Sequence, residues 1–164
     1  MSYFIRIERV PYEEPYHVEL HWQISNGNTT TTAEYYHNAS RLEKIAERLE
    51  VFPRHSTDKF LYDFGSERPE DRHAYYFRFL VFLHNSRGGC SILFRFNNNR
   101  PLPDTEITEF CIQKTEPAAI NQLGKMFRKF SKLEDEVMIW SSSYQFIGNK
   151  SDIDLGAWKK IKNA

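Results

Sequence analysis

The chain contains 164 residues, with 22 Lys plus Arg against 22 Asp plus Glu, so its formal net charge is zero. Nucleic-acid-binding proteins usually carry excess positive charge that displaces counterions from phosphates, so this balance argues against nucleic acid as a partner. Apolar residues make up 40% of the chain and aromatic residues 15%, which is typical of a folded protein and not of a disordered one. The length predicts a single domain over residues 1–164.

The amino terminus and the cysteines indicate the compartment. No basic stretch followed by a long apolar run begins the chain, as a secretory signal would. The longest unbroken apolar run, Phe79–Leu83, is far shorter than the roughly 20 residues of a membrane helix. Cys90 and Cys111 are too few for a disulfide framework or a zinc site of their own. We therefore expect a cytoplasmic protein with reduced thiols, no cofactor and no membrane partner.

Alternating apolar and polar residues predict strands over residues 3–10 and 17–25. Asn26 and Gly27 follow, a pair preferred in two-residue hairpin turns, so residues 29–36 are expected to form the returning strand. A turn centred on these two residues pairs residue i of one strand with residue 53 − i of the other, because 26 + 27 = 53.

Two helices are expected. The first begins at Ser40, which forms a capping-box pattern with Glu43, and it ends before Pro53. Its apolar residues recur at helical spacing: Leu42, Ile45, Ala46 and Leu49. The second helix begins near Thr115 and carries its own apolar stripe. This stripe comprises Ile120, Leu123, Phe127 and Phe130. Residues from about 148 to 164 are weakly patterned and are treated as an uncertain C-terminal extension.

Between the helices, apolar alternation predicts strands over residues 59–65, 74–84, 90–97 and 105–112. Strands joined by short turns form an antiparallel sheet, and two amphipathic helices would cover one of its faces. The expected fold is therefore α+β with two layers, in which a largely antiparallel sheet of about six or seven strands packs against two helices.

The two cysteines are expected to lie close together. A loop centred near residue 101 joins their strands, and antiparallel pairing about that loop places Cys90 opposite Cys111. Directly opposed cysteines have poor dihedral geometry for a disulfide, so we expect two free, largely buried thiols. The alternative is a nucleophilic Cys90 activated by His84 across the turn.

Four residues of the first hairpin are weak candidates for a metal site. His17, Glu19 and His21 occupy alternate positions of one strand and share a face, and the expected register places Glu34 opposite Glu19. Two histidines and two glutamates could ligate a metal ion or form an acid/base pair. The same pattern is typical of the solvent-facing side of an antiparallel hairpin, which we favour, with a protein-binding face as a further alternative.

The charged segment from Ser66 to His73, which contains Pro69, follows the strand that ends at Gly65. Six residues between positions 63 and 72 are protein-binding candidates: Asp63, Glu67, Arg68, Glu70, Asp71 and Arg72. Mixed charge of this kind is typical of a solvated surface. It also occurs at the rim of interfaces, where it sets the register and on-rate of a protein partner.

The order of these elements resembles a known group of proteins. The segment from Ser40 to Pro53 follows a polar hairpin and precedes an aromatic strand that ends at Gly65, before a long antiparallel pair and a closing helix. Over roughly residues 16–130, this arrangement resembles small, uncharacterised bacterial single-domain proteins, some of which resemble immunity proteins of polymorphic or contact-dependent toxin systems. The resemblance implies a protein that binds and neutralises a cognate toxin, and it carries over no catalytic residues.

The sequence contains no Gly-x-Ser-x-Gly, no glycine-rich phosphate loop and no His-Glu-x-x-His motif. We therefore expect a non-enzymatic protein-binding module, with a toxin domain as the partner that the resemblance implies. One alternative is a small metal-dependent or hydrolytic enzyme that uses the face of His17, Glu19, His21 and Glu34. The other is a structural or assembly subunit that uses its sheet edge, and a homo-oligomer is left open.

Overall fold

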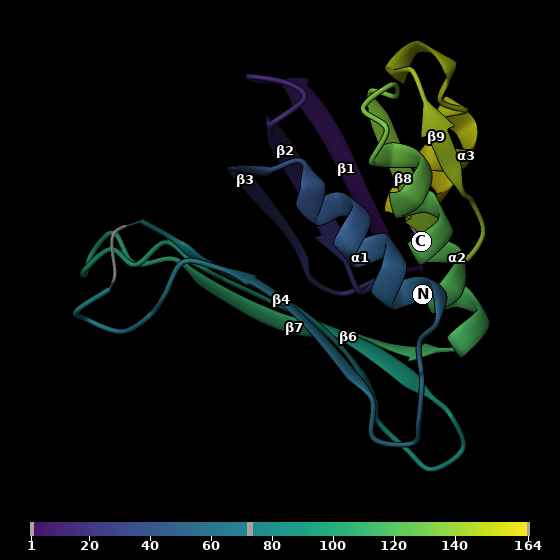
Figure 1. The fold of residues 1–164 in the computed structure, drawn as a ribbon, viewed down its shortest axis with the longest axis horizontal. Helices are drawn as coiled ribbons and strands as arrows, with labels where there is room; N and C mark the ends of the chain where they lie inside the picture. Colours follow the sequence, from purple (N-terminus) through teal and green to yellow (C-terminus); the bar gives the residue numbers. More distant parts are fainter. Residues whose placement is uncertain (1, 72–73, 164) are drawn as a thin grey trace. The chain divides into compact units, whose positions relative to one another are not determined.

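The computed structural model describes residues 2–71 and 74–163 (Figure 1). The chain forms two compact units. Unit 1 combines the residues up to Phe52 with those from Ala118 onward, and unit 2 is the continuous segment Pro53–Pro117 between them.

Unit 1 contains a five-stranded antiparallel sheet in the order β3-β2-β1-β8-β9. Its strands are β1 (Phe4–Pro11), β2 (His17–Ser25), β3 (Thr30–Asn38), β8 (Val137–Ser141) and β9 (Phe146–Gly148). Its helices are α1 (Ser40–Glu50), α2 (Pro117–Phe130), the 3-10 turn η1 (Lys150–Asp152) and α3 (Leu155–Lys162).

Helices α1 and α2 cover one face of this sheet (Figure 1). The apolar side of the strand alternation points toward them, so that the Trp22 and Phe127 rings lie 6.2 Å apart. Trp140 of β8 donates its indole N–H to the Ala119 carbonyl of α2. The two helices approach closely, and Asn121 of α2 donates to the Leu49 carbonyl in the last turn of α1 and to the Phe52 carbonyl just beyond it.

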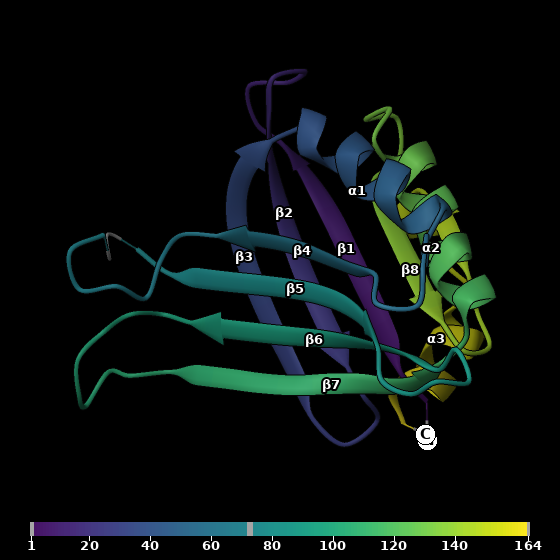
Figure 2. The same cartoon turned by 60° about the horizontal axis from the view of Figure 1, so that its bottom comes forward.

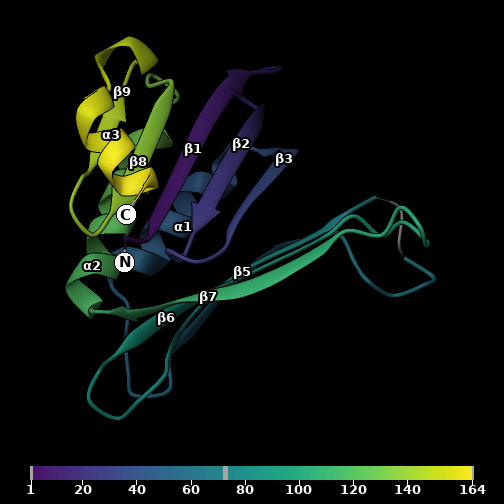
Figure 3. The same ribbon diagram turned by 180° about the vertical axis from the view of Figure 1, so that it is seen from behind.

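The C-terminal segment covers part of the opposite face. Figure 3 shows α3 beside β8 and β9. One buried cluster joins the sheet to this segment: Phe4, Val137, Ile139, Ile153, Trp158 and Ile161. The Phe4 and Trp158 rings meet edge to face at 4.9 Å. Asp154 caps α3 by accepting a hydrogen bond from the Ala157 backbone N–H, which begins the helix at Leu155. Residues 148–163, which the sequence left as an uncertain extension, therefore pack as part of unit 1.

Unit 2 is an antiparallel meander of four strands in the order β4-β5-β6-β7, which lie side by side in Figure 2. They are β4 (Lys59–Phe64), β5 (Tyr76–Leu83), β6 (Cys90–Asn97) and β7 (Ile107–Thr115). One face is aromatic and buried, with Phe79 of β5 paired to Tyr62 of β4 and Phe94 of β6. The other face alternates with it and carries charged and half-buried side chains.

The predicted α+β class and the antiparallel pairing are confirmed. The expected arrangement, six or seven strands against two helices, was partly wrong. Residues 2–71 and 74–163 contain nine strands in two sheets, of five and four strands, and three α-helices. The alternation marks each strand, but it does not state which strands pair, and β4–β7 pair only with one another.

The predicted register of the first hairpin was wrong by two residues. The turn is centred on Gly27 and Asn28, and Gly27 adopts a positive φ of +94° at the first central position. The Asn26 side chain accepts hydrogen bonds from the backbone N–H groups of Asn28 and Thr29, which places Asn26 before the turn. A shift of two residues keeps every side chain on its expected face, so the buried and exposed sides of the hairpin are unchanged.

The predicted cysteine pair was also wrong. Cys90 lies opposite Thr115, whereas Cys111 lies opposite Leu93, and the register is irregular between Cys90 and Ile92. Cys90 belongs to the buried face of the unit 2 sheet and Cys111 to the other face, where it is half-buried. Burial raises the pKa of both thiols above the usual range for cysteine.

Candidate protein-binding site

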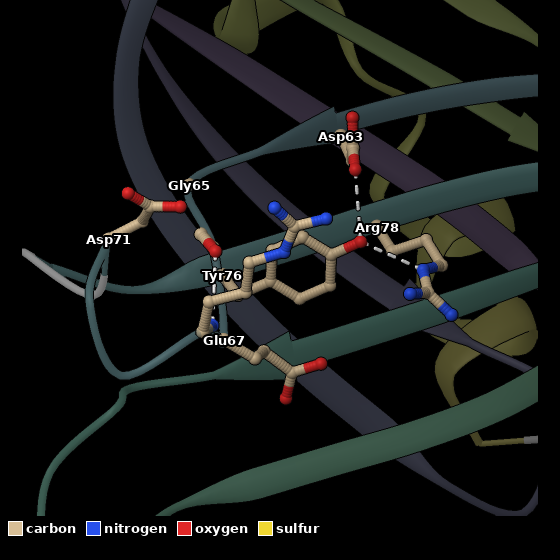
Figure 4. A pocket seen from close by; sticks show the side chains of 8 residues that line it. Asp63, Gly65, Glu67, Asp71, Tyr76 and Arg78 are labelled. Carbon is tan, nitrogen blue, oxygen red and sulfur yellow. Dashed lines mark hydrogen bonds between the residues drawn. The ribbon is translucent and has the colours of Figure 1, made fainter.

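A pocket of about 420 Å³ lies at one end of the unit 2 sheet, where β4 leads into the charged segment and β5 begins (Figure 4). We call it the charged pocket. Eight residues line it: Asp63, Gly65, Ser66, Glu67, Arg68, Asp71, Tyr76 and Arg78. Backbone and side-chain contacts of the chain itself explain why it forms here.

Gly65 ends β4 and turns the chain away from the sheet. Its φ is +72°, and a Cβ at this position would lie 2.1 Å from the Tyr75 carbonyl oxygen, so only glycine fits. Beyond it, the Ser66 hydroxyl accepts a hydrogen bond from the Arg68 backbone N–H, and the Asp71 N–H donates to the Arg68 carbonyl. These contacts fold the charged segment into the wall of the pocket.

Tyr76 joins two opposite charges inside the pocket. Its hydroxyl donates a hydrogen bond to Asp63 at 3.0 Å and accepts one from Arg78 Nε at 2.9 Å, as the dashed lines in Figure 4 show. The Arg78 guanidinium carbon lies 5.3 Å from the Tyr76 ring centre. Burial raises the pKa of Tyr76, so the hydroxyl stays protonated at neutral pH and can continue to donate.

Four charged residues cross the sheet beside the pocket. In the antiparallel register, Asp63 lies opposite Arg78, Arg78 opposite Arg95, and Arg95 opposite Glu109. We call these four residues the charged row. Their order across β4 to β7 is negative, positive, positive, negative, so like charges meet only at the central pair of arginines.

Arg95 is neutralised by carboxylates on two sides. Glu67 of the charged segment accepts hydrogen bonds from Arg95 Nε at 3.0 Å and from Nη2 at 2.7 Å. Glu109 accepts a third from Nη1 at 3.3 Å. Asn97 also donates to Glu67. The hydrogen bond from Arg95 is the largest cause of the lowered pKa of Glu67.

Four of the six predicted protein-binding residues line the charged pocket: Asp63, Glu67, Arg68 and Asp71. Glu70 is exposed and does not line it, and Arg72 lies outside the described residues. Sequence reasoning missed Tyr76 and Arg78. The strand alternation contains the signal, because both residues fall on the face of β5 opposite to Phe77 and Phe79.

The histidine and glutamate face of unit 1 is only partly assembled. His21 Nε2 lies 2.9 Å from a Glu19 oxygen, and His21 Nδ1 lies 3.7 Å from a Glu34 oxygen. Glu34 lies opposite His21 and not opposite Glu19, as a consequence of the corrected register. His17 instead contacts Glu13 at 3.1 Å. Within residues 2–71 and 74–163, no group of three or more His, Cys, Asp or Glu side chains is arranged to hold a metal ion.

A second pocket of about 520 Å³ lies in unit 2, around the β5–β6 turn. His84 lines it, but its Nδ1 lies 2.7 Å from the Ser91 hydroxyl. The thiol of Cys90 donates to the Gly88 carbonyl. The alternative of a Cys90 nucleophile activated by His84 is therefore not the arrangement seen around this pocket.

Comparisons with known proteins do not assign a family. No protein-family model and no curated protein matches the sequence. A solved structure described as the plant transcriptional regulator PBF-2 is similar at a TM-score of 0.41 and 10% identity, over 80% of this chain and 75% of that one. A similarity at this level assigns neither fold family nor function. Within the described part of the chain, no helix has the length and apolar character needed to span a membrane.

Proposed function

We propose that this chain is a non-enzymatic protein-binding module and that the charged pocket is its binding site. The observation that carries the proposal is the lining of the pocket, where Asp63, Tyr76 and Arg78 of the sheet meet three charged residues of the adjoining segment. Tyrosine and arginine are enriched among the residues that dominate protein interfaces. Charges of both signs around them would give a partner a defined register.

The finer proposal is that the partner is a toxin and that this chain is its immunity protein. Its support is the resemblance of roughly residues 16–130 to small bacterial proteins, some of which resemble immunity proteins. In such a role the chain needs no catalytic group, because occupation of the toxin surface is sufficient for neutralisation.

A protection assay tests both levels. The product of the gene beside this one is expressed in a bacterial host, and survival is measured with and without this chain. We expect the wild-type chain to restore growth and the Asp63→Ala/Arg78→Ala variant to fail. The matched control is His21→Ala/Glu34→Ala, which also removes one acidic and one basic side chain but from unit 1.

Protection by the pocket variant at the wild-type level contradicts the charged pocket as the binding site. A neighbouring product that is harmless and does not bind the chain contradicts the immunity role. If the control variant still binds the neighbouring gene product and the pocket variant does not, the broader proposal of a protein-binding module is supported even when that product is not toxic.

A second candidate function is a metal-dependent or hydrolytic enzyme. It is favoured by one observation, the contact of both His21 ring nitrogens with glutamate oxygens. A thermal-shift titration with Zn²⁺ or Mn²⁺ separates the two. We expect no stabilisation by the metal, and a rise in the melting temperature that disappears in His21→Ala would favour the enzyme. For the assembly-subunit alternative, light scattering would detect a concentration-dependent oligomer.

A further inference from the structure

The two arginines of the charged row differ in how they are neutralised. Arg95 has both Glu67 and Glu109 within 3.3 Å. Arg78 forms no ion pair with any carboxylate of the described residues, and its one side-chain hydrogen bond there is from Nε to the Tyr76 hydroxyl. Its two terminal nitrogens, Nη1 and Nη2, are therefore available to an acceptor from outside the chain.

Arg78 is also held in position. The Tyr76 hydroxyl that accepts from its Nε is itself fixed by donation to Asp63, and the guanidinium packs near the Tyr76 ring. A planar guanidinium with one edge fixed presents its terminal nitrogens as a fork, which matches the two oxygens of a carboxylate. Pre-orientation lowers the entropy lost on binding.

An apolar row runs beside the charged row on the same face. Leu61, Leu80, Leu93 and Cys111 lie opposite one another in turn across the four strands. Leu61 is 54% exposed, and the other three are half-buried. Leu80 is two residues from Arg78 along β5, or roughly 6.5–7 Å. A partner can therefore meet a cation and an apolar surface with two neighbouring side chains.

We infer that the partner protein places an Asp or Glu carboxylate on the Arg78 guanidinium and a neighbouring apolar side chain on the apolar row. This inference rests on the proposed function and names the chemistry of its partner. The two contacts together have the composition of an interface hot spot, a desolvated arginine beside an apolar surface.

The surrounding charges favour a carboxylate over a phosphate. Asp63, Glu67 and Asp71 line the same pocket, and each repels a phosphate dianion about twice as strongly as a carboxylate monoanion. A nucleic acid needs many unneutralised cations along its backbone, and the chain carries no net charge. A lysine from the partner would meet Arg78 and Arg68, so the basic partner is the alternative that the experiment must exclude.

Peptide titrations followed by NMR test the inference directly. The probe is the blocked peptide acetyl-Ser-Leu-Ser-Glu-Ser-Leu-amide, with counterparts in which Gln or Lys replaces Glu. We expect the Glu peptide to shift the Nε–Hε signal of Arg78. The Gln peptide should bind with an affinity at least about tenfold lower, as expected for loss of a charge-assisted hydrogen bond. The Lys peptide should produce no saturable shift.

Three variants and one control sharpen the result. Arg78→Ala should abolish binding of the Glu peptide. Arg78→Lys keeps the charge without the fork and should weaken it, as should Tyr76→Phe, which keeps the ring but frees Arg78. The matched control is Arg87→Ala, which removes an exposed arginine from the β5–β6 turn and should leave the affinity unchanged. Backbone spectra establish that each variant is folded, and the two conservative variants carry the test if Arg78→Ala is not.

Equal binding of the Glu and Gln peptides, tighter binding of the Lys peptide, or no Arg78 shift with any peptide overturns the inference. The protection assay, repeated with Asp63→Ala and Arg78→Ala as separate variants, distinguishes this outcome from failure of the proposed function. If binding of the partner needs Asp63 and not Arg78, the charged pocket is still the binding site but the partner is basic, and only the inference fails. If binding is unchanged by both substitutions, the proposed function of the pocket and the inference both fail.

Discussion

Unit 1 and unit 2 each contain an antiparallel sheet, and the two sheets differ in whether helices of the same unit cover their faces. In unit 1, helices α1 and α2 cover one face and α3 covers part of the other, so most apolar side chains of the sheet are buried against helices. The part of the chain described for unit 2 contains no α-helix, and one face of its sheet carries the charged and apolar rows. Substitutions in unit 1 should therefore change stability, and substitutions on that face of unit 2 should change binding.

The two regions also treat mixed charge differently. On the β2–β3 face of unit 1, His21 lies between two glutamates and contacts a carboxylate oxygen of each. On the charged face of unit 2, Arg95 also contacts two glutamates, whereas Arg78 is fixed by a neutral hydroxyl. Mixed charge in a sequence does not by itself mark a site. The distinguishing feature is a positioned charge whose terminal nitrogens form no hydrogen bond or ion pair with the residues that the structure describes.

The largest loss of stability should follow Phe127→Ala in unit 1. The Phe127 ring is fully buried and packs against Trp22, so truncation leaves a cavity in the helix–sheet core. We expect unfolding to become easier by about 3–5 kcal/mol. Urea denaturation followed by tryptophan fluorescence measures it. An unchanged midpoint would show that α2 does not pack as described.

Acid should destabilise unit 1 through His37. Burial, with a smaller contribution from the Arg41 charge, lowers its pKa from 6.5 to about 3. The unfolded chain therefore takes up a proton that the folded chain excludes. The free energy of unfolding keeps its full value above pH 6.5 and decreases as the pH falls from 6.5 toward 3. The expected slope is about 1.4 kcal/mol per pH unit in that window. His37→Gln should flatten it, and an identical slope in this variant would contradict the assignment.

Gly124→Ala tests the close approach of α2 to α1. A Cβ at this position would lie 2.6 Å from the Glu50 backbone nitrogen and 2.8 Å from the Leu49 carbonyl carbon, so the helices must separate. We expect a cost of about 1–3 kcal/mol, although alanine favours an isolated helix. The control is Gly156→Ala in α3, whose Cβ would meet only an Asp154 side-chain oxygen at 3.3 Å. A gain in stability for Gly124→Ala would show that the helices are not in contact there.

The sequence was informative about unit 1 and unit 2 to different depths. Periodicity located most strands and two helices, because burial imposes a period of two on strands and 3.6 on helices. Periodicity did not decide whether the turn is centred on Asn26 and Gly27 or on Gly27 and Asn28, because both pairs suit a tight hairpin. The Asn26 side-chain hydrogen bonds decide between them, and they form only once the loop is folded.

The charged pocket shows the same limit. The charged segment could be named from composition, whereas Arg78 sits in a strand whose apolar neighbours dominate the pattern. Its role depends on register, which brings Asp63 opposite it, and on Glu67 pairing with Arg95 from 28 residues away. A local pattern does not contain pairings of that length, so the difference between the two arginines appears only in the fold.

The smallest effect on stability should come from the ion pair that joins Glu67 to Arg95 of the charged row, and this is the sharpest test of the contrast between the units. Glu67→Gln removes the partially exposed ion pair with Arg95, and such pairs contribute about 0–1 kcal/mol. The substitution nevertheless leaves Glu109 as the remaining carboxylate on Arg95 beside Arg78, and it removes a carboxylate from the pocket. We therefore expect near-unchanged urea denaturation together with tighter binding of the glutamate peptide. A stability loss as large as that of Phe127→Ala would instead make the Glu67–Arg95 pair a structural element, and the charged face of unit 2 would then resemble the packed sheet of unit 1.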